Sequence, residues 1–320
     1  MKKGFTLIEL LAVIVILAVI ALISVPRIMD AIDESRAGAL RQNNEVVIKA
    51  SKNYLVTNTM SLPSEIGETI EIPLSELIEY NHINEIQSPY QNQNCSGYVL
   101  VTMNTSGQVY MPFINCTNEI NSSIEDGLIA HFLLYGDELD YSPTNNHGNA
   151  MNITPTKNHR GQLNNAVYFD GIDSKIDISN ENYNFGDDDD FTIMMWAKWY
   201  DTNRSFCNYR YHLNFNNFRT RGSSPINVYT NRDLNEWMHV AVTYVGSERQ
   251  MYMYVDGKLV DSQASVGSPL SSYTTLDGLT IGRTRHSSGT THSEVIKNDL
   301  RIYGRTLSSD EISQIYNQTR

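Results

Sequence analysis

The segment Phe5–Val25 constrains this chain more than any other feature, because it is a run of 21 residues whose only polar side chains are Thr6, Glu9 and Ser24. At about 1.5 Å per residue, a helix of this length spans roughly 30 Å, which is the thickness of the hydrocarbon core of a bilayer. Two lysines precede the run and orient its start towards the cytoplasm. The sequence therefore predicts a single membrane-spanning helix at the N-terminus.

Three interpretations of this helix compete. A cleaved secretory signal would have a shorter apolar run followed by a small-x-small cleavage site, and neither is present. An ordinary anchor fits the length but leaves Glu9 unexplained, since a carboxylate in hydrocarbon is costly and usually functional. The segment Gly4–Leu11, GFTLIELL, resembles the class III signal of type IV prepilins. This resemblance implies peptidase cleavage between Gly4 and Phe5, followed by N-methylation of Phe5.

The same resemblance gives a role to two further residues. In that family the carboxylate at the position of Glu9 pairs with the N-terminal amine of a neighbouring subunit, and two buried opposite charges are tolerable together but costly apart. Pro26 matches the proline that kinks the family's helix, because it removes a backbone donor. The implied partners are the prepilin peptidase, the membrane before assembly, and other pilin subunits through the N-terminal helix.

The helix is expected to continue beyond the membrane to about Thr57. Apolar or small residues recur at mostly three- to four-residue spacing, which is typical of an amphipathic helix. They are Ile28, Ile32, Ser35, Ala39, Val46, Ala50 and Tyr54.

A small head domain is expected at residues 58–124. The stretch 96–114 reads as a β-hairpin whose turn is centred between Thr105 and Ser106. Cys95 and Cys116 are equidistant from that centre, so an antiparallel hairpin places them opposite each other. A Cys95–Cys116 disulfide is therefore predicted in this exported segment, and two unpaired buried thiols are the alternative.

The remaining residues, 125–320, have short alternating strands separated by turn residues, which is typical of a β-sandwich. The pieces GLIAHFLLYG, NNAVYFDGIDSKIDIS, FTIMMWAKW, NEWMHVAVTYVG, MYMYVDGKLV and NDLRIYGRTLSSDEISQIY follow one another in that order. In this order they resemble the laminin G-like, concanavalin A-like jelly-roll family, over about residues 126–320. The expected fold is an α+β pilin, with a long N-terminal helix and a small antiparallel sheet, followed by an all-β jelly-roll sandwich. The expected domains are a leader at 1–4, a helix at 5–57, a pilin head at 58–124 and a lectin module at 125–320.

Members of that family commonly hold a structural calcium ion. By resemblance, Asp140, Asn146 and Asp299 are the candidate ligands, and hard oxygen ligands at a sheet edge suit Ca²⁺. The sequence departs from the family pattern, since Asn298 stands where a second acidic residue is usual and Pro143 interrupts the glycine-rich loop. Ordinary turn formation by Asp and Asn is the alternative interpretation.

A candidate ligand-binding face lies in the stretch 208–221. Alternation with period two places its aromatic residues in the core and its polar residues on the opposite, wet face. The polar residues are Arg210, His212, Asn214 and Asn216, with Arg219 and Arg221 extending the set. Arginine, histidine and asparagine suit hydroxyl-rich or anionic sugars, and a plain solvated sheet face is the alternative.

The formal net charge of −12 makes nucleic acid an unexpected partner, because an acidic chain is repelled by phosphate backbones. Motifs of hydrolases, metalloproteases and phosphate-binding enzymes are absent from the sequence, so no catalysis is expected. We expect a minor type IV pilus subunit, stored in the membrane as a single-pass prepilin. It then displays its lectin-like module outside the cell, sparsely or at the pilus tip, for adhesion to carbohydrate or to host or surface protein. The alternative is a structural pseudopilin of a secretion or DNA-uptake apparatus with a protein-binding jelly roll.

Overall fold

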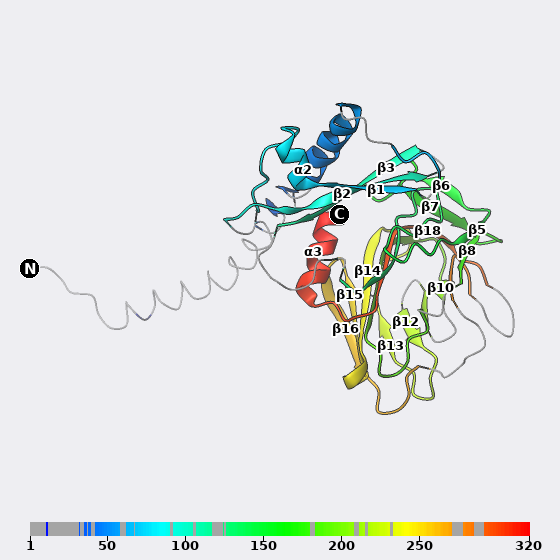
Figure 1. Cartoon of the computed structure of the whole chain (residues 1–320). Helices are drawn as coiled ribbons and strands as arrows, with labels where there is room; N and C mark the ends of the chain where they lie inside the picture. The colour runs from blue at the N-terminus through cyan, green and yellow to red at the C-terminus, as the bar shows by residue number, and fades with distance from the viewer. Residues whose placement is uncertain are drawn as a thin grey trace, which may run out of the picture. The chain divides into compact units, whose positions relative to one another are not determined.

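The structure is a computed structural model of the whole chain (Figure 1). It describes residues 42–57, 62–66, 68–89, 92–104, 107–116, 126–179, 183–207, 211–214, 217–230, 233–270, 278–284 and 291–320. It also describes the single positions Leu11, Ile32, Ser35, Arg36, Gly38, Ala39 and Ile124. The chain divides into two compact units.

The predictions about the N-terminal segment fall outside the described residues. They are the leader at 1–4, the cleavage between Gly4 and Phe5, and the roles of Glu9 and Pro26. Within the described ranges, no helix combines the length and apolar character that crossing a membrane requires.

The described part of the long helix, residues 42–57, buries one stripe of side chains. Val47, Ala50 and Tyr54 are almost fully buried, at the spacing of three to four residues that keeps side chains on one face. Val46, which the sequence pattern placed in this stripe, is 47% exposed. Ala50 lies three positions after Val47, so the buried face passes through Val47 and turns its neighbour Val46 to solvent.

A short helix and a three-stranded sheet accompany the long helix. The helix α2 (Leu74–Glu79) buries Leu74 and Leu77, and the hydroxyl of Tyr54 donates a hydrogen bond to the carboxylate of Glu76. The sheet has the order β1-β2-β3. Its strands are β1 (Thr69–Pro73), β2 (Ser96–Asn104) and β3 (Gly107–Asn115).

The predicted hairpin and its disulfide are both present. Strands β2 and β3 are neighbours, and Cys95 and Cys116, just outside them, form a disulfide with their Cα atoms 4.2 Å apart. Gly97 has φ +137°, and a Cβ atom there would lie 1.9 Å from the carbonyl oxygen of Phe113. The backbones therefore approach closely next to the disulfide, and only glycine fits at position 97.

The C-terminal part of the chain is an antiparallel β-sandwich, as predicted (Figure 1). One sheet has the order β13-β12-β11-β10-β17-β8-β5. Its strands are β5 (Asn149–Met151), β8 (Lys175–Ile178), β10 (Arg204–Cys207), β11 (Tyr211–Asn214), β12 (Asn217–Thr220), β13 (Asn227–Tyr229) and β17 (Leu279–Ile281).

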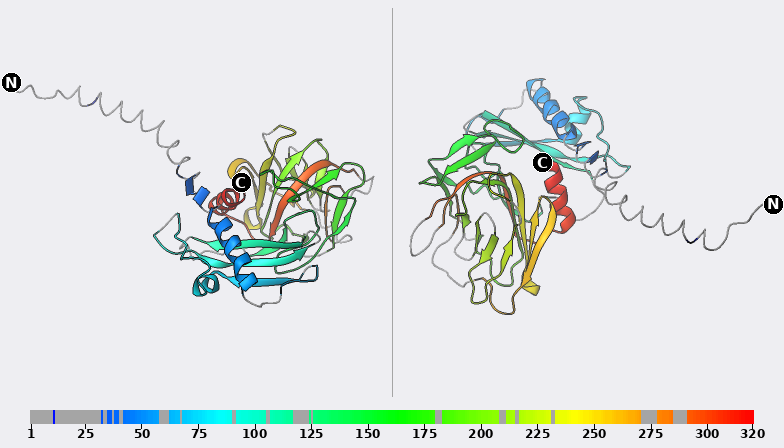
Figure 2. Two further views of the ribbon diagram at one scale, coloured as in Figure 1. Left: turned by 90° about the horizontal axis from the view of Figure 1, so that it is seen from above. Right: turned by 180° about the vertical axis from the view of Figure 1, so that it is seen from behind.

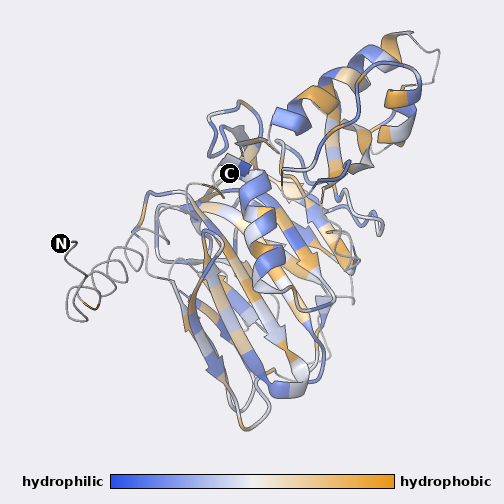
Figure 3. Ribbon diagram, turned by 90° about the vertical axis from the view of Figure 1, so that its left-hand side faces the viewer, coloured by the Kyte–Doolittle hydropathy of each residue, from blue (hydrophilic) through white to orange (hydrophobic). Residues whose placement is uncertain are grey.

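The second sheet has the order β16-β15-β14-β9-β18-β7-β6, with β4 also paired to β18. Its strands are β4 (Leu128–Phe132), β6 (Thr154–Thr156), β7 (Ala166–Asp170), β9 (Phe191–Trp199), β14 (Met238–Val245), β15 (Gln250–Val255), β16 (Lys258–Ala264) and β18 (Glu294–Tyr303). A single 3-10 turn, η2 (Gly246–Glu248), joins β14 to β15. Polar and apolar positions alternate along many of these strands (Figure 3).

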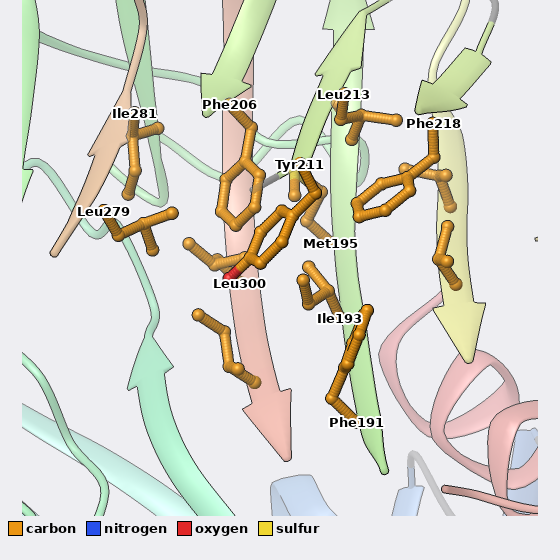
Figure 4. Packing of buried hydrophobic residues seen from close by; sticks show 14 of the residues in the cluster. Phe191, Ile193, Met195, Phe206, Tyr211, Leu213, Phe218, Leu279, Ile281 and Leu300 are labelled. Atoms are coloured by element: carbon orange, nitrogen blue, oxygen red, sulfur yellow. The ribbon is translucent and has the colours of Figure 1, made fainter. Parts of the chain in front are cut away.

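The core between the sheets is built from alternate residues of facing strands. Phe191, Ile193 and Met195 of β9 pack against Phe206 and Tyr211 of the opposite sheet (Figure 4). The aromatic rings stack in a continuous series, with the Phe191 and Tyr211 centroids 5.7 Å apart. Aromatic side chains bury large apolar areas, so this series supplies much of the sandwich's hydrophobic stabilisation.

One charged side chain lies in this core. Lys297 of β18 is fully buried, and its Nζ donates to the carbonyl oxygen of Ser205 at 2.9 Å. The ammonium group also lies over the rings of Trp199 and Phe206, 5.8 and 5.5 Å from their centroids. Burial lowers the pKa of Lys297 well below its usual value, because removing an ammonium ion from water is unfavourable.

The helix α3 (Ser309–Thr319) covers the outer face of the second sheet beside β14–β16 (Figure 2). It buries Ile312 and Ile315 against a cluster that includes Met194. The predicted capping box is present, since Glu311 N donates to Ser308 Oγ at 3.3 Å and Ser308 N donates to the Glu311 carboxylate at 2.8 Å.

The two sheets meet along the edge strands β13 and β16. The backbone N–H of Asn227 donates to Oε1 of Gln263, and that of Tyr229 donates to Oδ2 of Asp261, both at 2.9 Å. Side chains of β16 therefore satisfy edge donors of β13 that a neighbouring strand would otherwise bind.

Candidate ligand-binding face

The outer face of the seven-stranded sheet follows from the alternation of its strands. In β11, Tyr211 and Leu213 point into the core, so His212 between them points outwards. In β12 and β13, Phe218 and Val228 point inwards, which turns Arg219 and Asn227 outwards. The predicted division of this stretch into a core face and a polar face is thus present in β11 and β12.

The strand register brings outward positions of all seven strands into one row. Each position is the direct partner of the next one across the sheet. In order from β13 to β5, the row is Asn227, Arg219, His212, Cys207, Thr280, Asp177 and Asn149. Directly opposite residues in a sheet have their Cβ atoms about 5 Å apart, so the row forms a continuous line of mostly polar positions.

At the β8 end of this row, one carboxylate is shared by two cations. Arg283 donates to both oxygens of Asp177, at 3.0 and 2.9 Å, and Lys175 Nζ lies 2.6 Å from Oδ2. Thr280 Oγ1 donates to Oδ1 at 3.0 Å. The charges here are largely neutralised within the protein, which leaves one net positive charge.

At the β12 end, the arginine is accessible. Arg219 is exposed, whereas its neighbour His212 is only 3% exposed. The Nε–H of Arg221 donates to Nδ1 of His212, 3.4 Å away. Of the six predicted ligand residues, Arg219 is therefore the one that the structure places at the surface of the row, while His212 and Arg221 lie beneath or beside it.

The other predicted ligand residues are not placed. Arg210 and Asn216 lie outside the described residues, and Asn214 belongs to β11 with its side chain undescribed. The sequence interpretation missed Asn227, on the strand that follows β12, and Asp177, on the distant strand β8. Only the pairing of β17 with β8 and of β12 with β13 brings them into line.

Two parts of the chain match known family models. Residues 1–25 match the prokaryotic N-terminal methylation motif, and residues 170–313 match the concanavalin A-like lectin/glucanases superfamily. The chain joins a prepilin signal to a lectin-like domain. A comparison with curated proteins found no match.

A toxin binding domain of known structure shares the fold of the lectin-like domain. The binding domain of Paraclostridial Mosquitocidal Protein 1 is 16% identical, with a TM-score of 0.50 over 61% of this chain and 53% of that one. The binding domain of botulinum neurotoxin DC, solved in complex with SialylT, is 16% identical, with a TM-score of 0.47 over 62% of this chain and 53% of that one. The chain thus spans about half the length of these structures, and at this identity the likeness concerns the fold alone.

Asp140, one of the predicted calcium ligands of the lectin-like domain, is surrounded by donors. Its Oδ1 accepts from the backbone N–H groups of His131 and Ser142, at 2.8 and 2.9 Å. Its Oδ2 accepts from the hydroxyls of Ser142 and Thr144, at 3.0 and 2.9 Å, and from Asn146 N at 3.0 Å. Asn146 thus presents an N–H group, and not an oxygen ligand, to this carboxylate.

Asp299, another predicted ligand, is engaged by the His131 ring and by the Arg301 guanidinium. It lies 2.8 Å from His131 Nε2 and 2.8 Å from Arg301 Nε. Burial alone raises the pKa of the Asp299 carboxyl, but the Arg301 guanidinium and the hydrogen bond from His131 bring that pKa below its usual range. Burial also lowers the pKa of His131, which favours the neutral ring.

As placed, these residues do not fit a calcium ion, because donors already occupy both oxygens of Asp140 and Arg301 donates to both oxygens of Asp299. Across the described ranges, no group of three or more His, Cys, Asp or Glu side chains is placed to hold a metal. Calcium binding by the chain stays a prediction.

The acidic run Asp187–Asp190 shapes a loop. Asp187 Oδ1 accepts from Leu270 N at 2.8 Å, Asp189 Oδ2 accepts from Gly186 N at 2.7 Å, and Asp190 Oδ1 accepts from Gly246 N at 2.8 Å. These carboxylates therefore satisfy backbone donors of connecting segments.

Proposed function

We propose that the chain is a minor subunit of a type IV pilus that presents its lectin-like domain outside the cell for adhesion to glycans or surface proteins. The observation that carries this proposal is the presence of a methylation motif at residues 1–25 and a lectin-like domain at residues 170–313 in one polypeptide. The first module supplies export and assembly, and the second supplies a surface for a ligand.

Processing of the N-terminus follows from the prepilin signal. The peptidase cuts between Gly4 and Phe5 and the new N-terminus is methylated, so the mature chain begins with N-methyl-Phe5. Glu9 then pairs with the amine of a neighbouring subunit during assembly, and Pro26 bends the helix. Before assembly the subunit is held in the membrane by its single N-terminal helix.

The position in the pilus follows from size. A lectin-like domain of roughly 190 residues on a pilin of roughly 120 residues is too bulky to pack at every position of a filament, so the subunit is placed sparsely or at the tip. Its partners are other pilin subunits, the peptidase and an external ligand, and nucleic acid is not among them, in keeping with the net charge of −12.

The proposed activity is binding without catalysis. Glycoside hydrolysis commonly uses two carboxylates flanking the scissile bond. The outward row of the seven-stranded sheet contains a single carboxylate, Asp177, and Arg283 and Lys175 neutralise it. This arrangement supports a binding face and supplies no second acid.

The experiment compares bacteria that carry the full chain with bacteria whose chain ends after residue 124. We expect both to assemble pili, as seen by electron microscopy, and only the full chain to support attachment to glycan-coated or protein-coated surfaces.

A mass spectrum of the purified full chain should show loss of four residues and one added methyl group.

Unchanged attachment by the truncated strain contradicts the adhesive role. If that strain also loses protein secretion or DNA uptake, the result favours the alternative, a structural pseudopilin with a protein-binding jelly roll. Retention of the first four residues contradicts the processing step.

A further inference from the structure

The segment from Thr202 to Arg232 differs in charge from the rest of the chain. It contains five arginines, no lysine and no acidic residue, although the chain has 36 acidic residues and a net charge of −12. This segment supplies β10, β11, β12 and β13, which are four neighbouring strands of the seven-stranded sheet. A locally cationic surface on an acidic protein concentrates anions at that place.

The cationic character is not evenly available across the sheet. At the β8 end, Asp177 already binds Arg283 and Lys175. At the β12 end, Arg219 is exposed, and no ion pair of its guanidinium occurs among the described residues. An arriving anion therefore meets an open guanidinium only at the β12 end of the described row.

Arg219 and three other outward residues of β12 and β13 form a compact square. Arg219 is paired with Asn227, and Asn217 is paired with Tyr229. Residues paired across strands lie about 5 Å apart, and residues two apart along a strand lie about 7 Å apart, so the square is comparable to one sugar ring. Tyr229 is 48% exposed, which leaves much of its ring open.

The strand that carries half of this square is fixed from the side. Gln263 and Asp261 of β16 accept the backbone N–H groups of Asn227 and Tyr229. The Asn227 amide also donates to the Tyr229 hydroxyl. The square is therefore held by its backbone and by an internal hydrogen bond, which reduces the ordering required when a ligand binds.

We propose that this square, Arg219 with Asn217, Asn227 and Tyr229, binds an acidic glycan. The planar guanidinium of Arg219 pairs in a two-pronged manner with the carboxylate or sulfate of an acidic sugar. The Tyr229 ring packs against the apolar face of the sugar ring, and the amide nitrogens of the two asparagines donate to hydroxyl groups. This inference rests on the proposed adhesive function and names its ligand class.

A glycan fits this square better than a nucleic acid does. Duplex binding draws its affinity from many phosphate contacts at once, whereas the square offers one exposed guanidinium and is surrounded by a protein of net charge −12. A single charged group on an otherwise neutral sugar matches one arginine, one aromatic ring and two amides.

The test uses the full chain in detergent and two pairs of immobilised probes that differ only in charge. They are sialyllactose with lactose, and a chondroitin sulfate hexasaccharide with its unsulfated counterpart. We expect the acidic member of at least one pair to bind about tenfold or more tightly than its neutral twin, with the difference shrinking as salt is added. The pair that responds shows whether carboxylate or sulfate is the preferred group.

Variants locate the effect. Arg219→Gln should abolish the preference for the acidic probe, and Arg219→Lys should restore only part of it, because lysine keeps the charge but lacks the planar fork. Tyr229→Ala should weaken binding, whereas Tyr229→Phe keeps the ring and should retain it. The matched control is Lys258→Gln, which removes one exposed positive charge from β16 of the other sheet and should change nothing.

Equal affinity for acidic and neutral twins overturns the inference, and so does an Arg219→Gln variant that binds like the unaltered chain. The inference is also overturned by no binding to any probe by a chain whose near-ultraviolet circular dichroism shows it to be folded. Binding to neutral sugars that is independent of Arg219 overturns this inference alone and leaves the adhesive function standing. Binding of duplex DNA that is lost in Arg219→Gln also overturns it, since the square would then serve a polyanion.

Discussion

Removing the Cys95–Cys116 disulfide should loosen the small antiparallel sheet by a predictable amount. The bridge joins residues 21 positions apart in the sequence. In the chain-entropy description, closing a loop of that length removes about 11 cal/mol/K of entropy from the unfolded ensemble, which stabilises the fold by about 3 kcal/mol at 25 °C. The variant is the double substitution Cys95→Ala with Cys116→Ala.

Hydrogen exchange of the full chain in detergent, followed by mass spectrometry of its peptides, measures this effect locally. A loss of about 3 kcal/mol corresponds to roughly 100-fold faster exchange of the protected amides of β2 and β3. Amides of the sandwich strand β14 should be unaffected. A reducing agent should accelerate exchange in the unaltered chain to the same extent. The control variant Cys207→Ser keeps the Cys95–Cys116 bridge, so it should exchange like the unaltered chain before reduction and should respond to the reducing agent in the same way.

The reasoning is refuted by exchange in β2 and β3 that stays within a few-fold of the unaltered chain after both cysteines are replaced. Such a result means that the sheet and the buried stripe of the long helix hold the hairpin closed without help from the bridge. Faster exchange in β14 as well would mean that the two cysteines stabilise more than their own sheet.

Two further predictions concern buried charges in the sandwich. Lys297→Met should stabilise the fold by about 1 kcal/mol or more, because methionine fills the site without a buried amine, and the Ser205 carbonyl still accepts Gly282 N. The pKa of Lys297 is lowered in the folded state, whereas it is about 10.4 in the unfolded chain. Between these two values the unfolded chain binds one more proton than the folded chain, so the free energy of unfolding rises with pH up to about 10.4. Denaturation by urea at several pH values should show a weaker rise in the variant, and an unchanged rise contradicts the assignment. Asp299→Asn should destabilise the fold by about 3–5 kcal/mol, since it leaves Arg301 buried without its counter-charge. Because the folded pKa of Asp299 is lowered, its contribution is present above the unfolded pKa of about 3.9 and is lost as pH falls further, so the variant and the unaltered chain should converge in acid.

The alternation of residues predicted most of the sandwich correctly and failed where a bulge changes the parity of a strand. In β18, Val295 and Lys297 face the core, the pairing with β9 then shifts between Asn298 and Arg301, and Leu300 and Ile302 face the core beyond that point. Asp299 has φ +50° at this shift. Alternation extended back from Leu300 and Ile302 turns Lys297 outwards, because a period-two pattern does not anticipate the insertion.

For the candidate site, the sequence predicted which face of a single strand each side chain occupies, but not which strands pair. Alternation alone turned His212 and Arg219 to the same face, because that property is local. The burial of His212 and the alignment of Asp177 with it depend on pairings between strands far apart in the chain, such as β8 with β17 and β10 with β17. The pattern within one segment predicts which side chains of a strand face the core. The register between strands depends on contacts with other segments, so one segment alone does not predict it.

The contacts between β16 and β13 also affect whether neighbouring copies of this domain pair with one another through their strand edges. Subunits stored in one membrane meet at high local concentration, where an open strand edge can pair with the edge of a neighbour and cause aggregation. Because Gln263 and Asp261 already bind the outward N–H groups of β13, that edge offers no donors at Asn227 and Tyr229 to a second copy. Crowded domains can thus remain separate molecules, each with its own ligand square free to engage a surface.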